Sequence, residues 1–187
     1  MLELILGGAR SGKSALAERL AQRSGLDCVY IATATAGDGE MSERIRQHQL
    51  RRDDRWRTVE EPLALAQVLV REAAPQRCLL VDCLTLWLTN LLIDDDAERF
   101  AREREALLQV IQTLPGRILL VSNEVGQGIV PMNALARRFV DEAGWLHQAL
   151  ARRSERVLFV VAGLPQLLKG AALPQCELEE RECGESH

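Results

Sequence analysis

Five short, nearly continuous apolar runs punctuate the chain, and each is flanked by polar or glycine-rich sequence. Runs of this length, rich in leucine and β-branched residues, are typical of strands buried on both faces of a sheet. The predicted strands are Leu2–Leu6, Val29–Ala32, Cys78–Val81, Ile118–Val121 and Val157–Val161.

Between these runs, apolar residues recur with the spacing of amphipathic helices. The predicted helices are Ser14–Arg23, Met41–Asp53, Pro62–Glu72, Leu84–Ile93, Ala97–Leu114 and Asn133–Arg153. Strands that alternate with helices predict an α/β fold, in which a mostly parallel central sheet is flanked by helices. The pattern fades after Gly163-Leu164-Pro165, so we expect one domain over residues 1–170 and a polar, acidic, loosely ordered tail over residues 171–187.

Composition narrows the class of protein. The chain has 187 residues, of which 47% are hydrophobic, and this is enough for one domain with a substantial core. A net charge of −4 without a long basic run argues against a nucleic-acid partner. No apolar run approaches the roughly 20 residues of a membrane span, and the start lacks a secretory signal, so we expect a soluble, cytoplasmic protein with reduced cysteines.

Lysine is rare in this chain. Lys13 and Lys169 are the only two, whereas 21 basic residues are arginines. A lysine kept against this background suggests a role that arginine cannot fill. No role is predicted for Lys169, but Lys13 lies in the strongest motif of the sequence.

The segment Gly7-Gly8-Ala9-Arg10-Ser11-Gly12-Lys13-Ser14 follows the first predicted strand and opens a helix. It matches G-x-x-x-x-G-K-[ST], whose glycines let successive backbone N–H groups point at a phosphate beside a helix N-terminus. Lys13 is expected to bridge the β and γ phosphates, and Ser14 to hold Mg²⁺. The alternative is a glycine-rich turn that matches by chance.

Acidic residues follow two other predicted strands. Asp82 ends the strand Cys78–Val81, where a magnesium-side acid is needed, and it binds the ion either directly or through a water. A helix N-cap is the alternative role of Asp82, and the two roles are compatible. Glu124 follows Ile118–Val121 at the same predicted sheet edge and is a further site candidate.

The predicted helix Met41–Asp53 carries a cationic face. Arg44, His48, Arg51 and Arg52 share that face by their spacing, which suits a polyphosphate. The alternative is a solvated basic surface. Neutral imidazole is also a nucleophile that forms phosphoramidates, so His48 is a candidate for covalent catalysis.

The other histidines and the tryptophans have simpler interpretations. His147 lies on an amphipathic helix and is expected to be a packed or flanking residue. His187 is C-terminal and expected to be unstructured. Core packing is expected for Trp56, Trp87 and Trp145.

Several motifs together resemble a known family, the bifunctional adenosylcobinamide kinase / adenosylcobinamide-phosphate guanylyltransferases of cobalamin biosynthesis. The resemblance covers about residues 2–169. Beside the loop at residues 7–14, it rests on Tyr30-Ile31-Ala32-Thr33, Arg44-Ile45-x-x-His48, Trp56-Arg57-Thr58-Val59-Glu60, Asp82-Cys83-Leu84-Thr85 and Asn123-Glu124-Val125-Gly126-x-Gly128-Ile129-Val130-Pro131.

This resemblance implies a P-loop fold similar to the recombinase-type ATPase core and a trimer. It implies that adenosylcobinamide is phosphorylated with ATP or GTP, and that His48 takes GMP from GTP and passes it to adenosylcobinamide phosphate. Lys13 and His48 would be catalytic, with Mg²⁺ held by Ser14 and Asp82. The nucleotide would be bound by Gly7, Gly8, Ala9, Arg10, Ser11, Gly12, Lys13, Ser14, Thr33, Gln49, Leu50, Arg51, Arg52, Glu60 and Asp82.

Two other functions remain open from the residues alone. One is a small-molecule kinase in which the His48 helix only clamps phosphates and no covalent intermediate forms. The other is a P-loop ATPase that acts as a switch on a protein partner.

Overall fold

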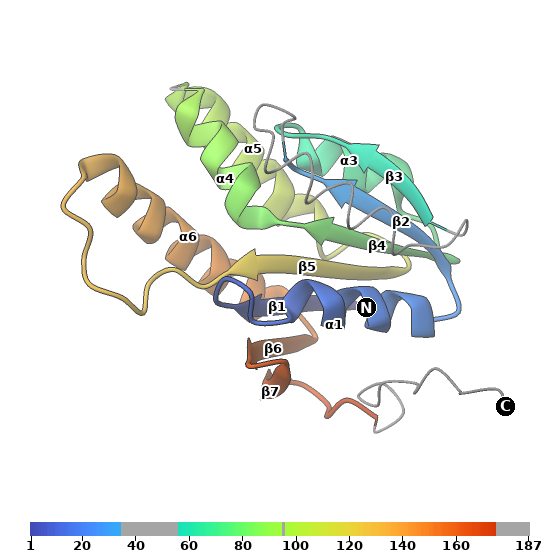
Figure 1. The fold of residues 1–187 in the computed structure, drawn as a ribbon. Helices are drawn as coiled ribbons and strands as arrows, with labels where there is room; N and C mark the ends of the chain where they lie inside the picture. The colour runs from blue at the N-terminus through green and yellow to red at the C-terminus, as the bar shows by residue number, and fades with distance from the viewer. Residues whose placement is uncertain (35–55, 95, 175–187) are drawn as a thin grey trace, which may run out of the picture.

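The computed structural model describes residues 1–34, 56–94 and 96–174, and strands alternate with helices along much of these ranges (Figure 1). The elements are β1 (Leu2–Gly7), α1 (Lys13–Arg23), β2 (Asp27–Ala32), β3 (Trp56–Glu60), α3 (Leu65–Glu72), β4 (Arg77–Asp82), α4 (Leu84–Ile93), α5 (Ala97–Val110), β5 (Arg117–Asn123), α6 (Ala134–Arg153), β6 (Arg156–Val161) and β7 (Leu164–Lys169).

The strands form one sheet in the order β3-β2-β4-β5-β1-β6-β7. Every neighbouring pair is parallel except β6 and β7, which are antiparallel. β1 lies between β5 and β6, so the loop that follows it opens near the middle of the sheet. The predicted mostly parallel α/β sheet is confirmed.

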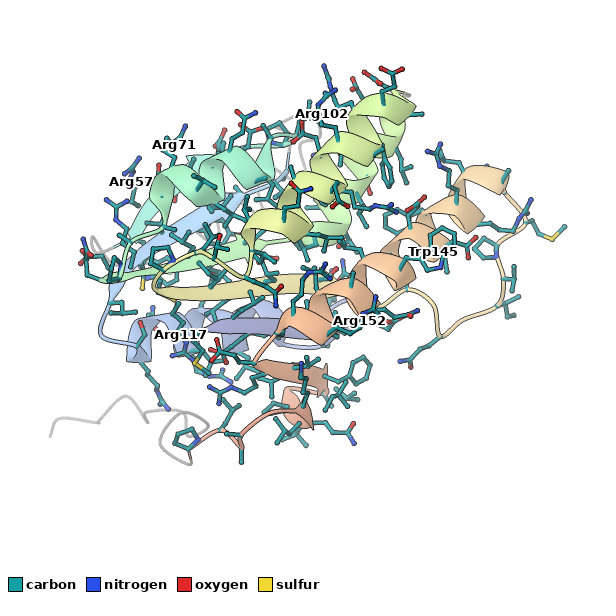
Figure 2. The ribbon with its side chains drawn as sticks, turned by 180° about the vertical axis from the view of Figure 1, so that it is seen from behind. Arg57, Arg71, Arg102, Arg117, Trp145 and Arg152 are labelled. Carbon is teal, nitrogen blue, oxygen red and sulfur yellow. The ribbon has the colours of Figure 1, made fainter. Side chains whose placement is uncertain are left out.

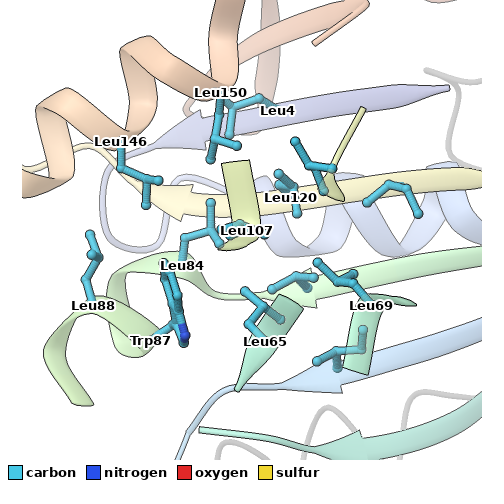
Figure 3. Close-up of a cluster of buried hydrophobic side chains, with 14 of the residues drawn as sticks. Leu4, Leu65, Leu69, Leu84, Trp87, Leu88, Leu107, Leu120, Leu146 and Leu150 are labelled. Carbon is cyan, nitrogen blue, oxygen red and sulfur yellow. The ribbon is translucent and has the colours of Figure 1, made fainter. Parts of the chain in front are cut away.

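Helices cover both faces of the sheet and create two apolar cores. On one face, α1 packs against residues that include Ile5, Leu80 and Leu119. On the other, α3, α4, α5 and α6 enclose the larger core, in which Trp87 is fully buried (Figure 3). Alternate side chains of each central strand enter opposite cores, which explains why these strands are apolar throughout.

Two strands were not predicted. β3 is short, with exposed Arg57, Thr58 and Glu60, so it lacks the continuous apolar run of a central strand. β7 contains Pro165 and mostly exposed side chains, as expected of an edge strand. The apolar pattern fades after residue 163 because an edge strand does not need two buried faces, and β7 lies inside the domain that was predicted over residues 1–170.

Two predicted helices are shorter than expected. The segment before α3 forms a turn because the Glu61 carboxylate accepts hydrogen bonds from the N–H groups of Leu63 and Ala64, at 2.9 and 2.8 Å. α5 ends at Val110, whose carbonyl accepts both the N–H and the hydroxyl of Thr113. The start of α6 was predicted correctly, and the Asn133 side chain caps it.

The tryptophans differ in their surroundings. Trp87 is buried as predicted, and Trp56 is half-buried with its ring against Tyr30. The expectation of core packing was wrong for Trp145, which is 56% exposed and lies on the outer side of α6 (Figure 2). Trp145 directly precedes Leu146, and adjacent residues of a helix point in different directions. Its side chain therefore lies off the apolar face that includes Leu146 and Leu150.

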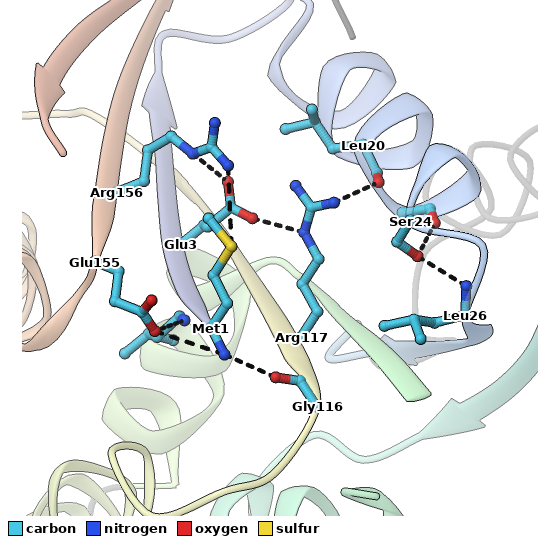
Figure 4. Close-up of polar contacts among 11 residues, drawn as sticks. Met1, Glu3, Leu20, Ser24, Leu26, Gly116, Arg117, Glu155 and Arg156 are labelled. Atoms are coloured by element: carbon cyan, nitrogen blue, oxygen red, sulfur yellow. Dashed lines mark hydrogen bonds and ion pairs between the residues drawn. The ribbon is translucent and has the colours of Figure 1, made fainter. Parts of the chain in front are cut away.

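The amino edge of the sheet holds a buried group of charges (Figure 4). Glu3 on β1 is fully buried, and its carboxylate lies 2.7 Å from Arg117 Nε on β5 and 2.8 Å from Arg156 Nε on β6. These pairs join three neighbouring strands where each begins. Removal of one partner from a buried group of paired charges leaves the other charges uncompensated and strongly destabilises the folded state. The charges at this edge therefore have a structural role.

Two further expectations concern membrane-spanning helices and the C-terminal segment. Within the described ranges, no helix has the length and apolar character needed to cross a membrane. Residues 175–187 lie outside the described ranges, so the predicted domain boundary at residue 170 and the loosely ordered tail stay predictions.

Candidate phosphate-binding site

The candidate site lies at the carboxyl edge of the sheet, where several strands end at the same level. Ala32 of β2 pairs with Glu60 of β3 and with Asp82 of β4, while Gly7 of β1 pairs with Asn123 of β5. Ligands of open α/β sheets bind at this edge. The strand order therefore brings together polar residues that are up to about 120 positions apart in sequence.

The loop after β1 is tightly packed at its first glycine. A Cβ on Gly7 would lie 2.6 Å from both the Ser11 hydroxyl and the Val160 carbonyl oxygen, so no larger residue is accommodated there. Gly12 has φ +93° and is the N-cap of α1, a conformation that favours glycine. The loop therefore leads directly into a helix N-terminus, as an anion site requires.

Lys13 is the first residue of α1 and is only 7% exposed. Its ammonium group donates a 3.2 Å hydrogen bond to the Gly8 carbonyl, so the side chain folds back across the loop. Burial lowers the pKa of Lys13, and the negative charge of Asp82 opposes this. A desolvated cation inside a loop of backbone donors is a site for phosphate oxygens.

Ser14 and Asp82 suit a magnesium ion by their chemistry. Ser14 lies half-buried in the first turn of α1, and Asp82 is half-buried at the end of β4. No group of three or more His, Cys, Asp or Glu side chains that could hold a metal occurs within the described ranges. A hydroxyl and a carboxylate oxygen are ligands of the kind that Mg²⁺ takes from proteins, and the ion completes its shell with phosphate and water.

The alternative role of Asp82 as a helix cap is not observed. The N-cap residue of α4 is Cys83 and not Asp82, and the Cys83 side chain makes no capping hydrogen bond. Asp82 is joined to Cys83 by a cis peptide bond. The Asp82 carboxylate is thus placed at the sheet edge by β4 and not by the start of α4.

Thr33 supports the end of β4 from the neighbouring strand. Its hydroxyl donates to the Cys83 carbonyl at 2.7 Å and accepts from the Cys83 N–H at 3.0 Å, and the residue is fully buried. Thr85 then links Cys83 Sγ to the side-chain amide of Asn123, with both distances 3.0 Å. A polar chain thus connects β2, β4 and β5 beside the loop, and the predicted nucleotide contact of Thr33 stays a prediction.

Glu124 and His147 form a second polar group. Glu124 donates its backbone N–H to the Gly7 carbonyl at 3.0 Å, and its carboxylate accepts from the Gly126 N–H at 2.6 Å. His147, buried as predicted, lies 2.7 Å from the Ser122 hydroxyl and 3.7 Å from Glu124. Burial lowers the pKa of His147, against the opposing charge of Glu124. Sequence reasoning missed this link because residues 122 and 147 lie on different elements.

The predicted site residues are not all near the loop. Glu60 is exposed on β3, four strand spacings from β1, which is roughly 19 Å along the sheet. Its predicted role is therefore compatible with the nucleoside end of a nucleotide but not with phosphates held by Lys13. The predicted helix Met41–Asp53 with His48, Gln49, Leu50, Arg51 and Arg52 lies outside the described residues.

Solved structures show the same fold. A RadB recombinase matches with a TM-score of 0.51 and 15% sequence identity, covering 84% of this chain and 73% of the recombinase. A Pyrococcus horikoshii OT3 protein of project PH0250 matches with a TM-score of 0.51 and 10% identity, covering 91% and 87%. At these identities only the fold is supported, and the predicted recombinase-type core is confirmed.

Sequence relatives identify the family. The family model described as "Cobinamide kinase / cobinamide phosphate guanyltransferase" matches residues 3–168. The chain is 68% identical to the bifunctional adenosylcobalamin biosynthesis protein CobP of Pseudomonas aeruginosa, over 92% of this chain and all of that protein. It is 39% and 40% identical to the CobU proteins of Escherichia coli and Salmonella typhimurium, over 90% of this chain and all of each. The predicted resemblance is confirmed, and the chain belongs to the cobinamide kinase / cobinamide phosphate guanyltransferase family.

Proposed function

We propose that this enzyme phosphorylates adenosylcobinamide with ATP or GTP and then transfers GMP from GTP to adenosylcobinamide phosphate, giving adenosylcobinamide-GDP and pyrophosphate. The observation that carries the proposal is the buried Lys13, held inside a glycine loop at a helix N-terminus. The family's two activities both use a nucleoside triphosphate, and this is the site in the described chain that suits one.

In the kinase reaction, the loop has to hold the β and γ phosphates and stabilise the charge that moves to them. The Lys13 ammonium leaves the Gly8 carbonyl for phosphate oxygens, which gives a stronger, charge-assisted hydrogen bond. Ser14 and Asp82 are proposed to hold Mg²⁺, which supplies positive charge against the developing negative charge. Positioning and electrostatics suffice for this step, because phosphoryl transfer needs little covalent chemistry from the protein.

In the guanylyl transfer, His48 is the proposed nucleophile. A nitrogen of its imidazole bonds to the α phosphorus of GTP while the bond from α phosphorus to pyrophosphate breaks. A phosphate oxygen of adenosylcobinamide phosphate then attacks the same phosphorus, and histidine leaves. Arg51 and Arg52, with Lys13, are proposed to stabilise the departing pyrophosphate.

Labelling tests this proposal. Purified protein with Mg²⁺ and GTP labelled at the α phosphate should retain label that survives alkali and is lost in acid. The label should disappear in His48→Ala and persist in His187→Ala, the matched control with the other uncharacterised histidine. Omission of Mg²⁺ should prevent labelling.

No label on protein that demonstrably binds GTP would refute the covalent step and favour a kinase without an intermediate. GTP or ATP hydrolysis at full rate without any corrinoid would instead favour the ATPase switch. Production of phosphorylated adenosylcobinamide tests the kinase half independently of His48.

A homo-oligomer, specifically a trimer, is proposed for the assembled enzyme. Large apolar side chains are exposed in the segment between β5 and α6, with Ile129 at 99% and Met132 at 95% exposure. Exposed apolar groups of this kind mark interaction surfaces in soluble proteins. Sedimentation of the purified protein tests this, and a monomer at micromolar concentration would contradict it.

A further inference from the structure

The turn between β6 and β7 packs directly against the phosphate loop. Gly163 donates its backbone N–H to the Ser11 carbonyl at 2.8 Å. A Cβ on Gly12 would lie 3.1 Å from the Gly163 Cα, and a Cβ on Gly7 would lie 2.6 Å from the Val160 carbonyl oxygen. The hairpin therefore contacts the loop at its beginning and at its end.

The turn has a backbone conformation that suits few residues. Ala162 and Gly163 have φ values of +52° and +80°, so both lie in the left-handed region, as in the tight turns of two-residue hairpins. In this conformation, between the antiparallel strands β6 and β7, the turn presents the Gly163 N–H to the Ser11 carbonyl. An added Cβ on Gly163 meets no atom within 4 Å, so strain from a substitution would come from the backbone alone.

The hydrogen bond fixes the direction of one peptide group in the loop. In a trans peptide the C=O and the following N–H point to opposite sides. Because the Ser11 carbonyl is held toward the hairpin, the Gly12 N–H of the same trans peptide points away from the hairpin. Loss of the turn would free this peptide to rotate.

We propose that Gly163 is a positioning residue for nucleotide binding, which acts by holding the Ser11–Gly12 peptide with its N–H toward the phosphates. The proposal rests on the proposed function in one respect, namely that the loop binds a nucleoside triphosphate. The β6–β7 hairpin, which contains no residue of the loop motif at positions 7–14, thereby gains a role in nucleotide binding. Gly163 does not touch the nucleotide in this account.

Two substitutions separate backbone conformation from size. Asparagine adopts positive φ more readily than other non-glycine residues, whereas valine strongly disfavours it. Gly163→Val should weaken Mg·GTP binding about tenfold or more, as expected for loss of a charge-assisted backbone donor. Gly163→Asn should remain within about threefold of wild type by the same scale. Isothermal titration with Mg·GTP measures both.

Gly25 provides a matched control. It has φ +69°, it also has no atom within 4 Å of an added Cβ, and it lies in the turn between α1 and β2 at the opposite edge of the sheet. Gly25→Val should lower the thermal unfolding midpoint as Gly163→Val does, but leave the affinity for Mg·GTP unchanged. In the kinase assay, Gly163→Val should raise KM for the nucleotide more than it lowers kcat.

Equal affinity of Gly163→Val and Gly25→Val for Mg·GTP would overturn the proposal, since both would then act on stability only. Should Gly163→Val not fold, Gly163→Ala gives the same comparison with less strain, and unchanged affinity there would also overturn it. A wild-type protein that binds no Mg·GTP would refute the proposed function itself, a result that the variants alone cannot produce.

Discussion

The two edges of the same sheet each bury a charged side chain, but they treat it differently. At the amino edge, Glu3 is paired directly with Arg117 and Arg156. At the carboxyl edge, Lys13 is buried with a backbone carbonyl as its hydrogen-bond acceptor, and the negative charge of Asp82 acts on it. The carboxylate held between two arginines has a structural role, whereas Lys13, whose hydrogen-bond acceptor is a neutral carbonyl, is able to turn to the phosphate oxygens of a ligand.

Removal of Lys13 should have the largest effect, a loss of activity without a loss of stability. Lys13→Ala should reduce both kinase and guanylyltransferase activity by about 10³-fold or more, because the phosphates lose their desolvated cation. Stability should stay equal or rise, since a buried ammonium group is removed from a low-dielectric site. Steady-state rates and thermal unfolding of the same preparations measure the two effects.

Lys13→Arg serves as the control for charge. It keeps the positive charge but replaces a compact ammonium with a planar group too large for the loop, so activity should remain low. Near-normal activity of Lys13→Ala would contradict the assignment of this loop as the nucleotide site.

Removal of the Glu3 charge should have the opposite pattern. Glu3→Gln leaves two buried arginines without their carboxylate and should cost about 3–5 kcal/mol of unfolding free energy. The rate per folded molecule should be unchanged, because the amino edge lies at the other end of the strands from Lys13. Urea unfolding, with activity measured well below the transition, tests this.

Glu155 provides the comparison at the same edge. It pairs with the N-terminal ammonium group at 3.5 Å, but its side chain is 63% exposed, so Glu155→Gln should change stability by less than about 1 kcal/mol. Equal losses in the two variants would show that burial does not set the strength of these ion pairs.

The carboxyl edge was more predictable from sequence than the supporting contacts around it. The loop from Gly7 to Ser14 is a contiguous motif, and Asp82 ends a continuous apolar strand, so local sequence revealed both. The Gly163 contact and the pairing of Ser122 with His147 were not predictable, because strand order sets them and no local pattern records it. β3 and β7 were missed because edge strands tolerate polar residues and proline.

The buried histidine at the carboxyl edge should make stability depend on pH. Burial lowers the pKa of His147 below its usual value near 6.5, so the folded state resists a proton that the unfolded state accepts. The contribution of neutral His147 to the unfolding free energy is then complete above about pH 6.5. It is lost as pH falls below that value, by at most about 1.4 kcal/mol per pH unit.

His147→Gln should lose this dependence while keeping a hydrogen-bonding partner for the Ser122 hydroxyl. Unfolding free energies of both proteins at pH 7.5 and 5.5 provide the measurement. The same pH slope in wild type and variant would mean that His147 is not the group responsible.

The second lysine should give the smallest effect, although it shares its residue type with Lys13. Lys169 ends β7 at the amino edge, where its ammonium donates to the carbonyls of Ala151 and Arg152 at 2.9 and 3.0 Å. It therefore compensates the C-terminus of α6, a contact of about 0.3–1 kcal/mol at an exposed position. Lys169→Met should lower stability by that amount and leave nucleotide affinity unchanged, whereas Lys169→Arg should restore stability because a guanidinium group also serves exposed carbonyls. A change in Mg·GTP affinity in Lys169→Met would mean that the hairpin transmits strain from the amino edge to Gly163, and the two edges would then not be independent.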